Sequence, residues 1–181
     1  MLGSADNDPV ILVDADDVQI GTAGKLDAHQ RGLKHRAISV LVRNSAGELL
    51  VQQRAKGKYH SGLLWANACC SHPLPGENPA EAAQRRLQQE MGFACPLQPL
   101  FTFDYRAAVS DDLIENELVH VFGGTYDGQI APDPAEVAQW KWIRFDDLAT
   151  DLREHPENYA VWFRKYVAAH GGLILGWLAR N

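Results

Sequence analysis

The chain has 181 residues, 46% of them hydrophobic and 22% charged, which is the composition of a globular protein with one full hydrophobic core. A net charge of -6 argues against a broad nucleic-acid-binding face, so an anionic ligand would need a local basic pocket. Three cysteines, two of them adjacent, do not make a disulfide framework, and no apolar run approaches the roughly 20 residues of a membrane span. We expect a cytoplasmic protein with one domain over residues 1–181.

The N-terminal segment predicts a short hairpin. Residues 1–9 are polar and are expected to be unstructured. Val10–Val13 and Val18–Ile20 flank an Asp-rich turn, as the two strands of a hairpin do. Residues 25–35 show no clear periodicity, and we predict no regular element there.

The next segment predicts a second pair of strands. Ala37–Val42 and Glu48–Gln53 are rich in β-forming residues, and Asn44–Gly47 between them is a strong turn signal. Antiparallel pairing of the two runs follows from so short a connection. Arg54–Leu63 is rich in Lys, Gly and Ser and is expected to be a loop.

The strongest local signal predicts a helix over Pro79–Met91. Asn78 suits the N-cap, Pro79 suits the first helical position and Gly92 ends the helix. Helical spacing predicts a buried face formed by Ala80, Ala83, Leu87 and Met91.

The second half of the chain predicts three strands followed by two helices. The strands are expected at Phe101–Tyr105, Ile114–Tyr126 and Val137–Phe145, and the helices at Asp146–Arg153 and Glu157–His170. Gly171 and Gly172 are expected to end the last helix, which leaves residues 171–181 as a C-terminal tail. This order predicts an α/β (α+β) fold in which helices cover both faces of a mixed sheet.

Two carboxylates in the predicted strand Ile114–Tyr126 indicate a chemical site. Glu115 and Glu117 point the same way, because alternate side chains of a strand share a face, whereas His120 points to the opposite face and is expected to be structural. Apolar neighbours make full solvation of two adjacent negative charges unfavourable, and a bound metal would resolve the conflict. The competing interpretation is an edge strand with solvated acids.

Histidines and cysteines add possible ligands and nucleophiles. His29, His35 and His72, together with carboxylates, suit a borderline ion such as Zn²⁺ or Mn²⁺, or Mg²⁺ where oxygen dominates. Cys69 and Cys70 are adjacent and therefore lack the Cys-x-x-Cys spacing of a structural zinc site. In an extended segment they point to opposite sides, so only one of them faces a given pocket.

Trp65–Glu77, with the sequence WANACCSHPLPGE, and IENE at residues 114–117 together resemble type I isopentenyl diphosphate isomerase. The resemblance runs roughly from residue 25 to residue 162 and implies the Nudix fold. The helix-borne Nudix box departs from the hydrolase pattern at Ser71, Arg86 and Gln89, which disfavours hydrolysis.

The resemblance implies a role for each matching residue. A divalent ion (Mn²⁺, Zn²⁺ or Mg²⁺) would be held by His29, His35, His72, Glu115 and Glu117. Cys70 and Glu117 would be catalytic, with Tyr105 assisting the carboxylate and Trp162 covering the hydrocarbon end of the substrate. The substrate diphosphate would contact Lys25, Arg54, Lys58 and Arg86. Glu90 would hold a substrate-associated Mg²⁺, whereas the simpler interpretation of Arg86 and Glu90 is a helix-surface ion pair.

The implied activity is the interconversion of isopentenyl and dimethylallyl diphosphate in isoprenoid biosynthesis, with Glu117 and Tyr105 as the acid and a Cys70 thiolate as the base, or with these roles reversed. The expected partner is this small molecule, with no nucleic acid or membrane, and the protein is expected to be a monomer or homodimer.

Two departures from the family pattern stand out: a His29–His35 interval one residue shorter than in some members, and a loop at residues 59–62 that lacks the usual Pro-Gly. The alternatives are a Nudix hydrolase of a nucleoside diphosphate derivative and a non-enzymatic metal-binding module.

Overall fold

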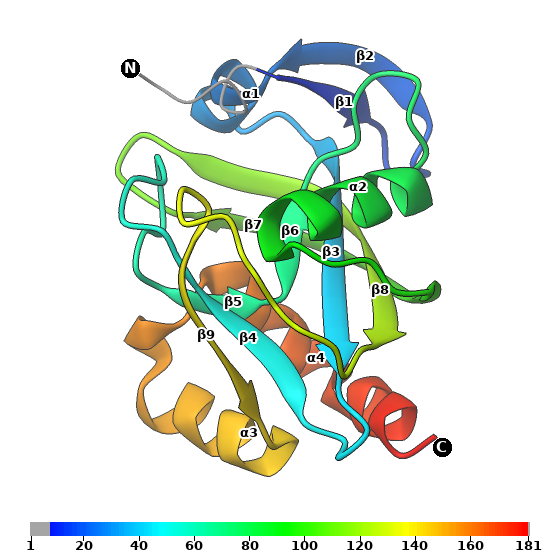
Figure 1. Cartoon of the computed structure of the whole chain (residues 1–181). Helices are drawn as coiled ribbons and strands as arrows, with labels where there is room; N and C mark the ends of the chain where they lie inside the picture. The colour runs from blue at the N-terminus through cyan, green and yellow to red at the C-terminus, as the bar shows by residue number, and fades with distance from the viewer. Residues whose placement is uncertain (1–7, 181) are drawn as a thin grey trace.

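The computed structural model describes residues 8–180, in which a nine-stranded mixed sheet has helices on both faces (Figure 1). The strands are β1 Pro9–Val13, β2 Gln19–Gly24, β3 His35–Arg43, β4 Leu49–Arg54, β5 Trp65–Asn67, β6 Cys69–Ser71, β7 Leu97–Ala108, β8 Ile114–Thr125 and β9 Val137–Ile143. The helices are α1 Lys25–Arg31, α2 Pro79–Met91, α3 Phe145–Glu154, the short 3-10 helix η2 Pro156–Asn158 and α4 Val161–Leu178. The predicted fold class is confirmed.

Strand β3 lies at the centre of the sheet and brings distant segments together. On one edge it pairs in parallel with β8, from His35 opposite Glu117 to Arg43 opposite Thr125. On its other edge it pairs with β6, where Ser39 lies opposite Cys70. The cysteine segment and the carboxylate strand therefore flank the same central strand.

The predicted hairpin of β3 and β4 is confirmed only next to its turn. The two strands share a single registered pair, Arg43 opposite Leu49. Beyond that pair β6 occupies the edge of β3, so β4 diverges and pairs with β5 and β9 instead.

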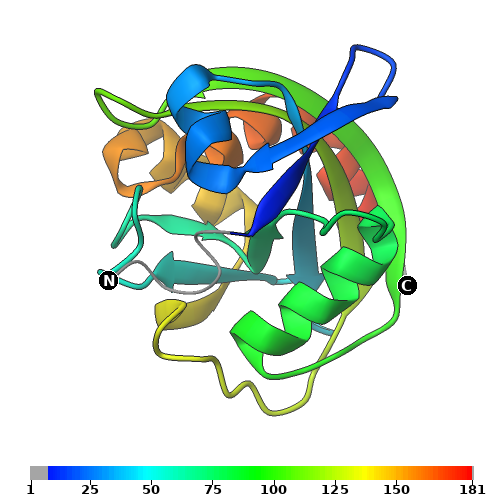
Figure 2. The ribbon, with the colours of Figure 1, turned by 90° about the horizontal axis from the view of Figure 1, so that it is seen from above.

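Alternating side chains of β3 separate two hydrophobic cores. Ala37 and Leu41 pack with residues of α3 and α4, whereas Ile38 and Val40 pack with residues of α2. Figure 2 shows α2 on one side of β3 and α4 on the other. Because odd-numbered residues of β8 such as Val119 and Val121 belong to the α4 side, Glu115 and Glu117 share that side as well.

Helix α2 begins and ends where the sequence predicts. Asn78 and Glu81 form a reciprocal capping box, and Gly92 ends the helix with a φ of 76°. The predicted buried face is wrong at Ala80, which is exposed. Burial on α2 begins two residues later, at Ala82.

Three segments differ from the sequence-based predictions. Helix α1 forms over residues 25–31, where no element was predicted, and the short strands β5 and β6 form in the segment before His72. Helix α4 does not end at the two glycines: it bends at His170 (φ -125°, ψ 15°) and continues to Leu178. Each glycine weakens a helix by about 1 kcal/mol, but burial of Ile174 and Trp177 after the bend offsets this.

The N-terminal prediction is tested only in part. Residues 1–7 of the segment expected to be unstructured lie outside the described residues, and Pro9 already begins β1. Within residues 8–180, no helix is both long and apolar enough to cross a membrane.

Candidate active site

One pocket, lined by residues of β3, β6, β8, α2 and α4, collects most of the side chains singled out from the sequence. The singled-out residues in its walls are four cations, a thiol, a histidine, two carboxylates and an indole. Those residues are Lys25, Arg54, Lys58, Arg86, Cys70, His72, Glu115, Glu117 and Trp162. Other predicted site residues, His29, His35 and Tyr105, lie behind this wall and contact its carboxylates.

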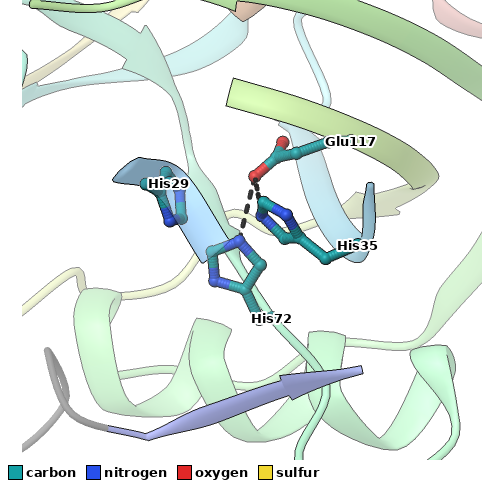
Figure 3. Close-up of side chains that lie close together, drawn as sticks. All are labelled: His29, His35, His72 and Glu117. Carbon is teal, nitrogen blue, oxygen red and sulfur yellow. Dashed lines mark hydrogen bonds and ion pairs between the residues drawn. The ribbon is translucent and has the colours of Figure 1, made fainter. Parts of the chain in front are cut away.

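Three histidines and a carboxylate converge at the inner end of the pocket (Figure 3). The ligating atoms of His29, His35, His72 and Glu117 all lie within 4.8 Å of one another. One oxygen of Glu117, Oε1, lies 2.9 Å from Nε2 of His72 and 3.4 Å from Nε2 of His35. Helix α1, the first residue of β3, the segment after β6 and β8 each contribute one member, so the site exists only in the folded chain.

Backbone carbonyls orient two of the three rings. Nδ1 of His29 lies 2.6 Å from the carbonyl oxygen of Lys25, and Nδ1 of His35 lies 2.8 Å from that of Leu33. A proton on each Nδ1 leaves Nε2 free to bind a metal, which is the arrangement of metal-ligating histidines. Nε2 of His35 is buried and has no hydrogen-bond partner within residues 8–180. The donor set therefore fits a divalent ion.

Tyr105 joins the two carboxylates of β8. Its hydroxyl donates to Oε2 of Glu117 at 2.9 Å and to Oε2 of Glu115 at 3.2 Å. Burial and the adjacent charge of Glu115 raise the pKa of Glu117 to about 7. Burial also acts to raise the pKa of Glu115, but the neighbouring imidazoles of His29 and His60 hold it well below its usual value. One carboxyl group thus readily carries a proton near neutral pH while its neighbour stays ionised.

The two adjacent cysteines separate as predicted. Cys69 is buried in the core beneath α2, whereas Cys70 lines the pocket. The Cys70 thiol donates to Oδ1 of Asn67 at 3.0 Å and lies 3.2 Å from Oγ of Ser39. Burial raises the pKa of Cys70 to about 12, even though both hydrogen bonds act to lower it. This shift favours the neutral thiol, the form that would act as the acid if the expected roles of Cys70 and Glu117 are reversed.

Two of the cations at the outer end of the pocket pair with carboxylates. Arg86 pairs with Glu90 at 2.7 Å, and Lys58 and Arg86 both contact Glu136 from the loop before β9. Glu136 was not singled out from the sequence, because nothing in its spacing links it to the helix that carries Arg86. Glu90 does not line the pocket and belongs to neither candidate metal group found within residues 8–180. The ion pair expected from the Arg86–Glu90 spacing is present.

The indole of Trp162 lines the pocket. Trp162 lies in the first turn of α4, is buried, and has the Arg54 guanidinium 5.1 Å from its ring centroid. An indole face can stabilise a positive charge that lies over it. The expected role of Trp162 in covering the hydrocarbon part of a ligand stays a prediction.

Two other histidines have clear positions. His120 bonds to Asp17 on the opposite face of β8, with Nε2 2.8 Å from Oδ2, which agrees with a structural role. His60 was not predicted as a site residue, although its Nε2 lies 3.0 Å from Oε1 of Glu115. Its only signal in the sequence was its place in the loop that lacks the usual Pro-Gly.

Comparisons with known proteins identify relatives of this chain. A family model described as NUDIX domain matches residues 33–166. Isopentenyl-diphosphate Delta-isomerase 2 of Aromatoleum aromaticum is 52% identical over 86% of this chain and 82% of its own length. The isopentenyl-diphosphate Delta-isomerase of Burkholderia multivorans is 51% identical over 92% of this chain and 94% of its own length.

Solved structures support the fold. A protein of Deinococcus radiodurans matches with a TM-score of 0.69 at 17% identity, over 82% of this chain and 90% of that one. A MutT protein of Methanosarcina mazei matches with a TM-score of 0.64 at 16% identity, over 77% of this chain and 94% of that one.

Proposed function

This chain belongs to the isopentenyl-diphosphate Delta-isomerase family, which has the Nudix fold, and we propose that its pocket converts isopentenyl diphosphate to dimethylallyl diphosphate and back. The observation that supports this most directly is the meeting of Cys70, Glu117 and a cationic outer end in one pocket. A double-bond shift needs two proton carriers near the hydrocarbon and an anchor for the diphosphate, and the side chains of this pocket are suited to both roles.

The substrate would lie with its diphosphate at the outer end of the pocket. Lys25, Arg54, Lys58 and Arg86 would bind the phosphate oxygens there. Glu90, with Glu136 close by, supplies the negative charge needed to hold an accompanying Mg²⁺. Binding energy from these groups, remote from the reacting carbons, would fix the position of the short hydrocarbon chain between the proton carriers.

The reaction moves one proton in and one proton out. Glu117, assisted by the Tyr105 hydroxyl, would donate a proton to the terminal CH2 carbon, and the double-bond electrons would form the new C–H bond. The tertiary cation that results would lose a proton from the CH2 on the diphosphate side to the sulfur of Cys70, and that C–H electron pair would form the new double bond. Trp162 would exclude water and stabilise the cation, worth about 2 kcal/mol when desolvated.

The protonation states of Glu117 and Cys70 before and after one turnover account for a neutral Cys70 thiol. Forward turnover begins with protonated Glu117 and ionised Cys70 and ends with ionised Glu117 and a Cys70 thiol. That final state is the one required to begin the reverse reaction. Burial raises the pKa of Cys70 and so favours this thiol state, and a proton must return from Cys70 to Glu117 before the next forward turnover.

A divalent ion at the inner end of the pocket would be held by His29, His35, His72, Glu115 and Glu117, whose donor set suits Zn²⁺ or Mn²⁺. When bound, it would offset the repulsion between the two buried carboxylates and orient Glu117. We also propose that the enzyme acts in the cytoplasm, because Cys69, Cys70 and Cys95 are all free thiols.

The test is to incubate the purified protein with isopentenyl diphosphate and Mg²⁺ and to follow the reaction by proton and phosphorus NMR. The proposal predicts dimethylallyl diphosphate with both phosphates still attached. Release of inorganic phosphate, or turnover of nucleoside diphosphate derivatives in place of isopentenyl diphosphate, would instead support a Nudix hydrolase.

A further inference from the structure

His60 has the position and orientation of a metal ligand. Its side chain is 4% exposed although it comes from the loop between β4 and β5, and its Nε2 lies 3.0 Å from Oε1 of Glu115. The ligating atoms of His60, His29 and Glu115 all lie within 4.8 Å of one another. Two ligands of one zinc ion are separated by at most twice the metal–nitrogen distance, about 4.2 Å. A small movement of the loop would therefore bring this group around one ion.

The ring of His60 is oriented like those of His29 and His35. In each ring Nδ1 lies close to an oxygen outside the cluster: Ser61 Oγ at 3.1 Å for His60, and backbone carbonyls for the other two. In each ring Nε2 faces the carboxylates of β8. An outward Nδ1 partner that leaves Nε2 facing the site is the usual arrangement of ligating histidines.

We propose that His60 is an additional ligand of the same ion that His29, His35, His72, Glu115 and Glu117 hold. A separate second ion does not fit the geometry, because both groups of potential ligands share His29 and its Nδ1 is engaged by the Lys25 carbonyl. A single inward nitrogen of His29 binds one ion, and His60 then completes a set of four imidazoles and two carboxylates.

The additional imidazole gives the site a chemical preference. Nitrogen ligands favour Zn²⁺ and Co²⁺ over Mg²⁺, which prefers oxygen. His60 would also link the ion to the outer end of the pocket, because it follows Lys58 by two residues and its carbonyl accepts a hydrogen bond from Arg54 at 3.3 Å. The loop would thus carry both a metal ligand and a diphosphate anchor.

The test uses the full-length protein with ¹⁵N-labelled histidine, prepared metal-free and then loaded with ¹¹³Cd²⁺. Direct Cd–N bonds split the ring nitrogen signals, whereas a changed hydrogen bond only shifts them. We expect split signals from His29, His35, His60 and His72 and unsplit signals from His120, His155 and His170, which serve as controls. The variant His60→Phe should remove one split signal, which assigns it, and leave the other three.

This inference depends on the metal site of the proposed function. The spectra distinguish a failure of the His60 assignment from a failure of the metal site itself. Three split signals with His60 unsplit would overturn the role of His60 and leave the metal site intact. No split signal at all would overturn the metal site and the role of His60 together. As a second readout, His60→Phe should weaken Zn²⁺ binding by at least about 10-fold in competition with a coloured chelator, while an unchanged affinity would contradict the proposal.

Discussion

Tyr105 offers the sharpest mutational test of the proton-transfer pair. The variant Tyr105→Phe removes only the hydroxyl that donates to Glu117 at 2.9 Å and to Glu115 at 3.2 Å. The ring is buried and stacks on Phe103 with centroids 5.3 Å apart, so phenylalanine keeps the packing of the core. The change therefore isolates the hydrogen bonds from the fold.

The expected magnitude follows from the kind of bond that is lost. A hydrogen bond to a charged group is worth about 1.5–3 kcal/mol. If the hydroxyl supports Glu117 mainly in the transition state, loss of this energy lowers kcat between about 10-fold and about 160-fold, at 1.36 kcal/mol for each factor of ten. KM for isopentenyl diphosphate should change little, since the diphosphate anchors remain intact.

The assay is steady-state isomerisation of isopentenyl diphosphate, with the metal content of each preparation measured alongside. A matched control is Tyr126→Phe, which removes a hydroxyl that donates to the Gln129 carbonyl at 2.9 Å, outside the pocket. The control should keep its full kcat. Unchanged kcat in Tyr105→Phe with full metal content would refute the role of Tyr105 as the partner of the acid.

Three further variants test separate parts of the account. Cys70→Ala should lower kcat by about 10²–10⁴-fold with metal content unchanged, while Cys69→Ala should be mild, and equal losses would contradict the assignment. Glu115→Gln should lower bound metal measured by elemental analysis, and full occupancy would remove it from the ligand set. Hydrogen bonds from Arg85 lower the pKa of Glu77 in the folded protein below 4.5. Ionised Glu77 therefore stabilises the fold at a pH above its unfolded-state pKa, and this contribution is lost as the pH falls through its folded-state pKa. The urea concentration at the unfolding midpoint should thus be lower for Glu77→Gln than for the parent at pH 7, but equal at strongly acid pH. A difference in midpoint that persists in acid would contradict this.

Helix α2 shows how a Nudix scaffold can carry different chemistry. Two carboxylates of its box region are matched with guanidinium groups: Glu77 with Arg85, at 2.7 and 2.8 Å, and Glu90 with Arg86, at 2.7 Å. Without a ligand, the two arginines balance the charge of these carboxylates. The main candidate metal ligands lie on α1, β3 and β8 and near β6, beside the proposed proton carriers.

Local chemistry made part of the site predictable from the sequence. The capping box and terminal glycine defined α2 to the residue, because these signals act within one helix turn. The strand period placed Glu115 and Glu117 on one face and separated Cys69 from Cys70, because this rule needs only an extended backbone.

The elements and site residues that the sequence did not predict depend on tertiary structure. Helix α1 has only 7 residues and no side-chain cap, so its stability comes from packing and not from a readable pattern. Strands β5 and β6 have 3 residues each, too few for periodicity. His60 and Glu136 lie in loops that approach the pocket only because other elements place them there, so spacing along the chain gave no signal.

The most direct test of the central claim is the isomerisation of isopentenyl diphosphate in D2O, with the product recovered and examined by NMR. Proton transfer from Glu117 or Cys70, whose protons exchange with solvent, predicts dimethylallyl diphosphate with deuterium in a methyl group. Product formed without deuterium would indicate that the same hydrogen moves within the substrate, and it would contradict a mechanism based on two exchangeable proton carriers.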